Sequence, residues 1–288
     1  MVAVRPARPR RARPASWLLW AAGMVAAIGW ALPLVWMVST SVKPPNQVLT
    51  RTVEWLPRTV TFENYAKVME KPVVHWLVNS IVATAGSTAV SLGTGAMAGY
   101  ALARLNFPGR NTLFFLVLAV LIIPTEMTIV PLFIGVLKVG LVDSYLALMV
   151  PSLASAFSVY LFRNFFLSLP RELEDAASID GASRFRTFWS VALPVARPAV
   201  IAAAILLSTN YWNAFLWPLL VIFHEPMKTL PVGMAAFTPG TGVGQSTQIG
   251  GYAPAMAATT ILTIPSVVVF LLLQRQFIEG ATGAGIKG

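Results

Sequence analysis

The segment Trp17–Val38 reads WLLWAAGMVAAIGWALPLVWMV and contains no charged residue. A helix needs about 20 apolar residues to cross the hydrocarbon core of a bilayer, so this segment is long enough to span a membrane. A membrane-spanning β-strand needs only about 10 residues, of alternating polarity. Because the segment is longer and does not alternate with period two, it predicts a transmembrane helix.

Five further stretches resemble this segment in length and in scarcity of charge. Among all six, only the third contains a charged residue, Glu126. The chain therefore predicts an all-α integral membrane protein, a six-helix bundle over residues 17–274 with tails at 1–16 and 275–288. The predicted spans are 17–38, 79–103, 112–134, 144–162, 198–223 and 250–274.

The overall composition agrees with this fold. Of the 288 residues, 56% are hydrophobic and 11% are charged, whereas soluble domains carry about 25% charged residues. This excludes an ordinary soluble enzyme and a disordered tail. The chain has no cysteine, which excludes disulfides and iron–sulfur clusters. Its two histidines, His75 and His224, lie far apart, so we expect no metal site and assign neither a role.

The net charge of +10 is unevenly distributed between the two sides of the predicted bundle. The N-terminal tail, the loops after the second and fourth spans and the C-terminal tail hold about twice as many Lys and Arg residues as the other side. Since cytoplasmic loops carry the excess of cations, both termini are predicted to be cytoplasmic. The arginines of residues 5–13 fit anionic lipid headgroups better than nucleic acid, and the apolar run behind them is too long for a signal peptide.

The loop 163–197, between the fourth and fifth spans, is the most charged part of the chain. Pro170 suits the first turn of a helix, and the acids that follow it favour the helix dipole. Gly181 is placed to end this helix, and Ser183 can cap a second short helix over 184–191. The loop therefore predicts a helix–turn–helix on the cytoplasmic face. Its small alanines would let a partner approach closely, but it could also be a connector on the membrane surface.

This loop carries a motif similar to the EAA motif of bacterial ABC import permeases. The family pattern is Glu-Ala-Ala, three residues, Gly, nine residues, Ile, one residue and Leu-Pro. The matching residues, all at the family spacing, are Asp175, Ala176, Ala177, Gly181, Val191, Leu193 and Pro194. Asp175 replaces the usual Glu, and Val191 replaces the usual Ile. Because Asp is one methylene shorter than Glu, Glu174 could take over a contact that the family's Glu makes.

Other segments, from about residue 17 to the end, resemble the maltose-type, carbohydrate-importing branch of this family. Taken together, they are similar to its six-helix, MalG-like permease subunit. These segments are 39–44 (STSVKP), 63–65 (ENY), 79–80 (NS), 103–110 (ARLNFPGR), 211–218 (YWNAFLWP) and the glycine-rich end 280–288 (GATGAGIKG).

The resemblance implies how such a chain works. A permease of this family hydrolyses nothing itself. It pairs with a second, similar permease, two ATPase subunits bind ATP and Mg, and an extracytoplasmic solute-binding protein delivers the substrate. The sequence agrees, because it contains no P-loop and no acid–base constellation. We therefore expect no enzyme activity, no cofactor and no metal in this chain, which would lie in the bacterial inner membrane.

The resemblance also implies that the loop docks in a groove of an ATPase subunit. Leu193 and Pro194 would fix the return of the chain into the fifth span. The tail 283–288 would reach between the ATPases, or it could be simply disordered. The residues expected to carry the coupling are Glu174, Asp175, Ala176, Ala177, Asp180 and Gly181.

A polar and aromatic cluster in the fifth span is the candidate for the substrate path. Asn213 lies about 15 residues into this span, roughly 22 Å from its cytoplasmic end, and a buried amide there needs a hydrogen bond. Tyr211, Trp212 and Trp217 offer stacking surfaces for sugar rings. An aromatic belt with interhelical packing is the alternative, and the resemblance places the main sugar contacts in the partner permease.

Glu126 is a further candidate for the path, because a carboxylate inside a membrane usually faces a cavity or a partner. It lies between Pro124 and Pro131, which we expect to bend or break the third span. It could serve as a gate, or it could serve helix packing or lie at the outer interface. The outer loop 223–250 could contact the binding protein or act as a flexible linker.

Three alternatives remain beside a sugar importer. The same architecture could import glycerol-3-phosphate or a related phosphodiester, although the spans contain no Lys or Arg to bind an anion. An ion-coupled secondary transporter would show ionisable residues in the membrane and an internal repeat, and only Glu126 points that way. A membrane scaffold could use the inner loop for assembly alone.

Overall fold

The computed structural model describes residues 15–49, 54–239 and 251–283, and every regular element in these ranges is a helix. This confirms the predicted all-α fold. The elements are α1 (Ala15–Ser41), η1 (Pro45–Gln47), α2 (Glu63–Met69), α3 (Val73–Arg104), α4 (Arg110–Ile122), α5 (Thr125–Lys138), α6 (Tyr145–Met149), η2 (Val150–Ala154), α7 (Ala156–Ser168), α8 (Glu172–Ile179), α9 (Arg184–Thr187), η3 (Phe188–Ala192), α10 (Leu193–Val195), α11 (Arg197–Trp212), α12 (Leu216–Val221), η4 (Glu225–Met227), α13 (Leu230–Ala235) and α14 (Tyr252–Gly283).

Up to six parts of the described chain are long and apolar enough to cross a membrane. The helices α1, α3 and α14 are each long and apolar enough by themselves. Three more candidates are bent pairs of helices: α4 with α5 at 102°, α6 and η2 with α7 at 44°, and the segment Arg184–Val195 with α11 at 76°. Counting each pair as one span gives up to six by length and composition, the predicted number, although Arg184–Val195 belongs to the loop predicted to be cytoplasmic and only α11 of that pair lies in the predicted fifth span.

The third predicted span bends where its first proline stands. The chain leaves α4 at Ile123, whose φ of −75° and ψ of 122° are extended. A proline pushes the residue before it out of the helical region, so Pro124 explains this bend. Pro131, in contrast, lies inside α5 without ending it.

The stretch 198–223, expected to be one helix, is interrupted. The helix α11 ends at Trp212, and α12 begins at Leu216 and contacts α5 and α6. Neither glycine nor proline occupies the break itself. Pro218 lies in the first turn of α12, where the missing N–H of a proline is tolerated, so it is compatible with a new helix start.

The centre of the fold is the contact between α3 and α7. A Cβ atom added to Gly95 would lie 2.4 Å from Cβ of Ser158, and one added to Gly99 would lie 2.7 Å from Cβ of Phe162. Small residues four positions apart thus let the two helices approach closely, as they do in many membrane proteins. Aromatic side chains pack at one end of this contact, with Tyr100, Phe162, Phe166 and Phe188 all buried.

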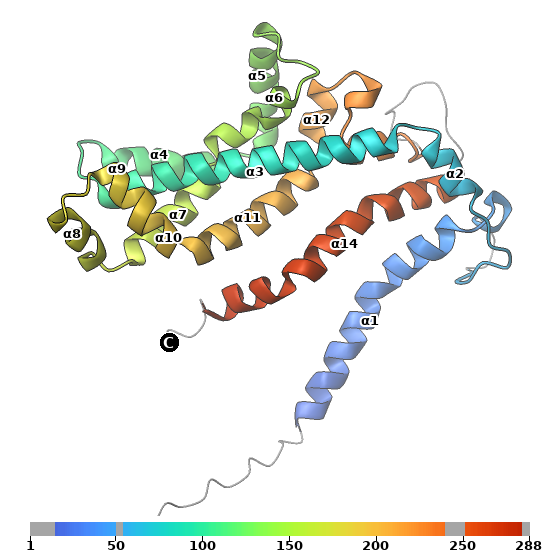
Figure 1. Ribbon diagram of the computed structural model, residues 1–288. Coiled ribbons are helices and arrows are strands. Elements are labelled where there is room, and N and C mark those ends of the chain that lie inside the picture. The colour runs from blue at the N-terminus through green and yellow to red at the C-terminus, as the bar shows by residue number, and fades with distance from the viewer. Residues whose placement is uncertain (1–14, 50–53, 240–250, 284–288) are drawn as a thin grey trace, which may run out of the picture.

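Figure 1 shows α3 running along the bundle, with α2 at one end and α8 and α9 at the other. The helices α1 and α14 lie side by side near α2, and α1 diverges from α14 toward its own N-terminus. This arrangement places the segment predicted to dock a partner at one end of the bundle. The end near α2 is the predicted outer side.

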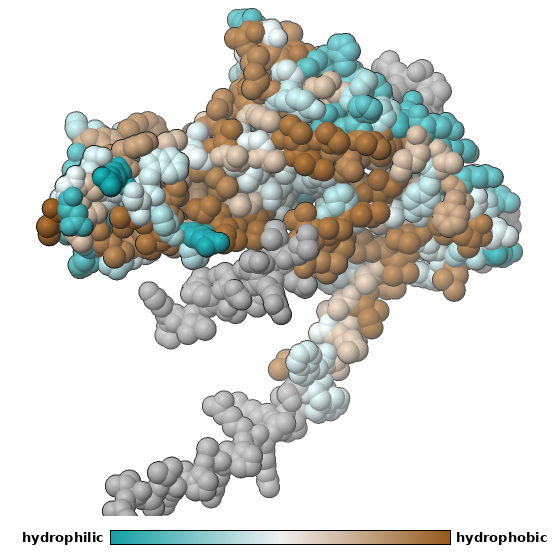
Figure 2. Space-filling model, viewed as in Figure 1, coloured by the Kyte–Doolittle hydropathy of each residue, from teal (hydrophilic) through white to brown (hydrophobic). Residues whose placement is uncertain are grey.

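Much of the described surface is apolar, as the brown regions of Figure 2 show. None of the most apolar window of α1 is buried, and Trp30 is 83% exposed. Soluble monomers rarely expose such large apolar areas. The surface therefore suits contact with lipid or with another membrane subunit.

Candidate coupling and translocation sites

The loop that carries the EAA-like motif folds as α8, a turn at Gly181 and a second helical segment that begins at α9, which agrees with the predicted helix–turn–helix in outline. Three acids stand in the first turn of α8, where the helix dipole favours negative charge. The helix ends at Ile179, and Gly181 two residues later has a φ of +77°, which suits a residue without a side chain. The hydroxyl oxygen of Ser183 then accepts a hydrogen bond from the N–H of Arg186, at 3.3 Å, and caps α9.

The return toward the fifth span differs in detail from the prediction. The helix α9 is only four residues long, and a π-helical turn, η3, follows it before α10. Leu193 is half-buried against the aromatic core, whereas Pro194 is exposed. The segment Arg184–Val195 and α11 are bent by 76° relative to each other. Pro170 stands two residues before α8 rather than in its first turn.

The two neighbouring acids of the motif point in different directions. Glu174 is buried, and its Oε1 atom lies 3.0 Å from Nε of Arg104, the last residue of α3. Asp175 is exposed. Glu174 is therefore occupied within this chain, and Asp175 is free to face a partner.

The exposed face of α8 combines polar and apolar groups. Ala176 and Asp180 are exposed beside Asp175, and Ala177 is half-buried. Ile179 is 87% exposed, which is unusual for so large an aliphatic side chain outside the predicted membrane. We call Asp175, Ala176, Ile179 and Asp180 the outward face of α8. Ile179 was not among the predicted coupling residues, although its spacing of three from Ala176 places both on one side of a helix.

Two of the path candidates support the structure around the helix break. The hydroxyl of Tyr211 lies 2.5 Å from that of Ser91, which joins α11 to α3. The indole N–H of Trp217 donates to the carbonyl oxygen of Ala147 at 2.9 Å, which joins α12 to α6. Both side chains are half-buried and line a small cavity of about 30 Å³.

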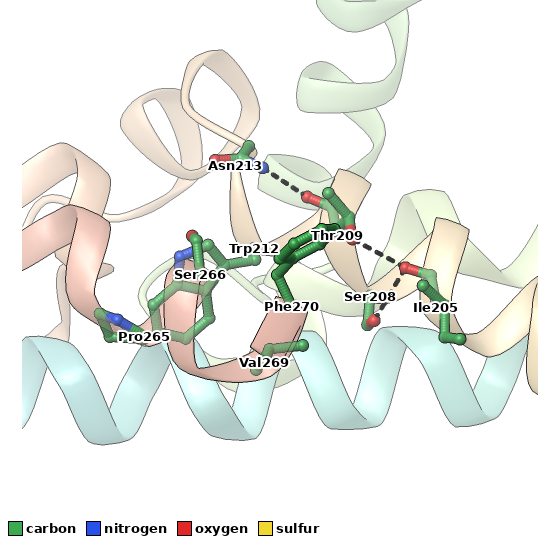
Figure 3. A pocket seen from close by; sticks show the side chains of 9 residues that line it. All are labelled: Ile205, Ser208, Thr209, Trp212, Asn213, Pro265, Ser266, Val269 and Phe270. Atoms are coloured by element: carbon green, nitrogen blue, oxygen red, sulfur yellow. Dashed lines mark hydrogen bonds between the residues drawn. The ribbon is translucent and has the colours of Figure 1, made fainter. Parts of the chain in front are cut away.

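The other two aromatic-cluster residues, Trp212 and Asn213, line a larger cavity of about 200 Å³ between α11 and α14 (Figure 3). Asn213 donates from Nδ2 to the carbonyl oxygen of Thr209 at 2.8 Å, so its amide is hydrogen-bonded as expected, although the residue is exposed. The buried Nε1 of Trp212 has no acceptor among the described residues. The lining has no charged side chain: Ile205, Ser208, Thr209, Trp212, Asn213, Pro265, Ser266, Val269 and Phe270.

Glu126 lies apart from this cluster. It is exposed in the first turn of α5, where its charge suits the helix dipole. In Figure 1, α5 projects away from α11 and α14. The structure therefore brings Trp212 and Asn213 to the larger cavity, Tyr211, Trp212 and Trp217 to the smaller one, and Glu126 to neither.

The predicted outer side is tied together by residues far apart in sequence. Asn79 donates from Nδ2 to the carbonyl oxygens of Pro226 and Lys228, at 2.7 and 3.0 Å, and accepts from the Tyr145 hydroxyl at 2.6 Å. These bonds hold the segment after α12 against α3. Most of the glycine-rich part of the outer loop, from residue 240 to 250, and the tail 284–288 lie outside the described residues.

A second tie on this side joins Asp143 to the segment after α12. Oδ1 of Asp143 accepts the N–H groups of Phe223 and His224, at 2.6 and 2.9 Å, and Oδ2 lies 2.8 Å from Nδ1 of His224. Burial alone would raise the pKa of the Asp143 carboxyl, but these three contacts outweigh it and lower the pKa below its usual value. His224, to which the sequence assigned no role, thus has a structural one.

The chain is similar to known transport permease proteins over nearly its whole length. The chain is 35% identical to the arabinooligosaccharides transport system permease protein AraQ of Halalkalibacterium halodurans, over 95% of this chain and 97% of that protein. It is 34% identical to the trehalose transport system permease protein SugB of Mycobacterium tuberculosis, over 93% and 97%.

A solved structure shares the fold. It is the crystal structure of a bacterial ABC transporter involved in the import of the acidic polysaccharide alginate, with a TM-score of 0.76 and 23% identity over 94% of this chain and 99% of the matched chain. Residues 91–282 match the family described as binding-protein-dependent transport system inner membrane component. This match covers the outward face of α8 and the cavity lined by Trp212 and Asn213. The chain belongs to that family, the membrane permeases of binding-protein-dependent ABC transport systems.

Proposed function

We propose that this chain is a permease subunit of an ATP-driven importer of a sugar or oligosaccharide, and that it couples to an ATPase subunit through the outward face of α8. The observation that carries the coupling role is the opposed placement of two adjacent acids. Glu174 is neutralised inside the chain by Arg104, whereas Asp175 is exposed next to Ala176 and the protruding Ile179. Ala176, the protruding side chain of Ile179 and the free carboxylate of Asp175 together suit a groove of a partner subunit that is apolar at its base and carries cations at its edge.

The proposal assigns the chemistry of ATP to other subunits. Two ATPase subunits would bind ATP and Mg, and a second permease would complete the path. A solute-binding protein would deliver the substrate at the end of the bundle where α2 lies. Closure of the ATPases would move α8, and the path would open alternately to each side of the membrane. The cation-rich side, with α8 and both termini, would then be cytoplasmic.

We assign the substrate path to the cavity lined by Trp212 and Asn213. Its hydroxyl and amide groups can exchange hydrogen bonds with a sugar, and the faces of Trp212 and Phe270 can pack against a pyranose ring. The lining carries no cation that would bind a phosphate group. The relatives reported above are named for sugars. A phosphodiester importer is therefore not favoured. Tyr211 and Trp217 would hold the break in place, and Glu126 remains a candidate for a gate.

The experiment that tests this function is co-purification. The chain is expressed with the ATPase of its own transport system, and residues 175–181 are replaced by a flexible linker of equal length. We expect the wild-type chain to retain the ATPase and the linker variant to lose it. The control is the same replacement over residues 45–49, at the opposite end of the bundle. Failure to recover an ATPase with the wild-type chain would contradict the proposal.

A further inference from the structure

A buried ion pair joins the end of α3 to α8. Nε of Arg104 and Oε1 of Glu174 lie 3.0 Å apart as an ion pair without hydrogen-bond geometry, and the two side chains are 4% and 11% exposed. The same guanidinium donates from Nη2 to the carbonyl oxygen of Leu169 at 2.6 Å, just after α7. A buried charge that loses its partner is left uncompensated, which fixes this geometry strongly. One side chain thus ties α3, α7 and α8 together.

The other main packing partners of α8 are α9 and η3, which are parts of the same loop. Glu174 also interacts with Tyr100, a second residue of α3. The ion pair, by contrast, connects α8 directly to a helix that runs the length of the bundle (Figure 1). A displacement of α8 relative to the bundle must therefore either carry the end of α3 with it or separate two buried charges.

The helix α3 is suited to pass such a displacement on. It packs tightly against α7 at Gly95 and Gly99, where a side chain would not fit. Near its other end, Asn79 binds the carbonyl groups of the outer segment after α12. Between these points, Ser91 touches Tyr211 of α11, next to the helix break. Movement of α3 would thus reach both the outer segment and the proposed path.

We propose that the Arg104–Glu174 pair is a strut that transmits the movement of α8 to α3. Glu174 is then a positioning residue for coupling, whereas docking belongs to Asp175 and the outward face. This inference rests on the proposed function, because it presupposes an ATPase that moves α8.

The test separates docking from coupling. Glu174→Gln keeps the shape of the side chain and removes its charge. In the assembled complex in proteoliposomes, three quantities are measured: ATPase retained, ATP hydrolysed in the presence of the binding protein, and sugar transported per ATP. We expect the ATPase to be retained and the transport per ATP to fall about tenfold. Glu172→Gln, an exposed acid of the same first turn, is the matched control and should leave the ratio unchanged.

Reversal of the pair guards against a purely structural effect. Arg104→Glu and Glu174→Arg should each lower the ratio, and the double variant should recover part of it, because opposite charges again face each other. A ratio unchanged by Glu174→Gln, or a double variant no better than the single ones, would overturn the strut. If the strut is overturned but the wild-type complex still transports sugar, the proposed function stands. If the wild-type chain retains no ATPase, both proposals fail.

Discussion

The loop around α8 and the break between α11 and α12 are held by different kinds of contact. In the loop, Gly181 lies just after the end of one helix and Ser183 caps the next through the N–H of Arg186, three positions away. At the break, Trp217 is held by the carbonyl of Ala147, 70 positions away. Local signals set where the two helices of the loop end and begin, although the Arg104–Glu174 pair anchors α8 to α3, whereas tertiary contacts shape the break itself. The two should therefore respond differently to substitution.

The largest effect is expected where both regions share a support, at the α3–α7 contact. Gly99→Leu would place a side chain against Cβ of Phe162 and the backbone nitrogen of Arg163, at 2.7 and 2.8 Å from the new Cβ. We expect a loss of about 1–3 kcal/mol of stability, seen as a lower thermal transition of the purified protein. Gly93→Leu is the control, since nothing lies within 4 Å of its Cβ. Equal losses in both variants would contradict close packing.

A substitution in the loop should act locally. Gly181→Val forces a β-branched residue to a φ of +77°, at a cost of about 1–2 kcal/mol. Gly181→Asn should cost less, because asparagine tolerates this conformation. Retention of the ATPase in a pull-down should fall in the order Gly, Asn, Val, with the thermal transition of the bundle nearly unchanged. If Gly181→Val lowered the thermal transition of the bundle while the ATPase stayed bound, Gly181 would support the bundle and not the docking loop.

A substitution at the break should act on tertiary contacts. Trp217→Phe removes the donor to Ala147 and should cost about 1 kcal/mol. Trp212→Phe removes an N–H that has no acceptor among the described residues, so it should cost little stability but weaken transport. Thermal shift and uptake assays on both variants separate the two roles. Similar stability losses would show that the two indole N–H groups are equivalent.

The same contrast explains what could be predicted from the sequence. Six apolar stretches gave the fold, and an acid-rich turn followed by Gly181 and Ser183 gave the two-helix loop, because their signals lie within a few residues. The inward turn of Glu174 could not be predicted, since its partner Arg104 is 70 positions away and appears in the sequence as one of several loop cations. The interruption after Trp212 was missed because the stretch 198–223 is uniformly uncharged.

The smallest effect is expected at the outer tie, and it depends on pH. The pKa of Asp143 is lower in the folded chain than its usual value, so its carboxylate stabilises the fold above about pH 4 and this contribution is lost as the pH falls below that value. Asp143→Asn should lower the thermal transition at pH 7, and the difference from wild type should close under acidic conditions. A difference that persists unchanged from pH 7 to pH 3 would rule out the charged contacts with His224 and the backbone.

The most direct test of the central claim uses the absence of cysteine from the chain. Single cysteines are introduced as Ala176→Cys and Ile179→Cys on the outward face of α8, and as Val139→Cys, which is 67% exposed after α5. A short bifunctional reagent is added to the complex with its ATPase, and the products are identified by mass. The account predicts cross-links to the ATPase from positions 176 and 179 and none from position 139. Cross-linking from 139, or none from either α8 position in a complex that hydrolyses ATP, would contradict it.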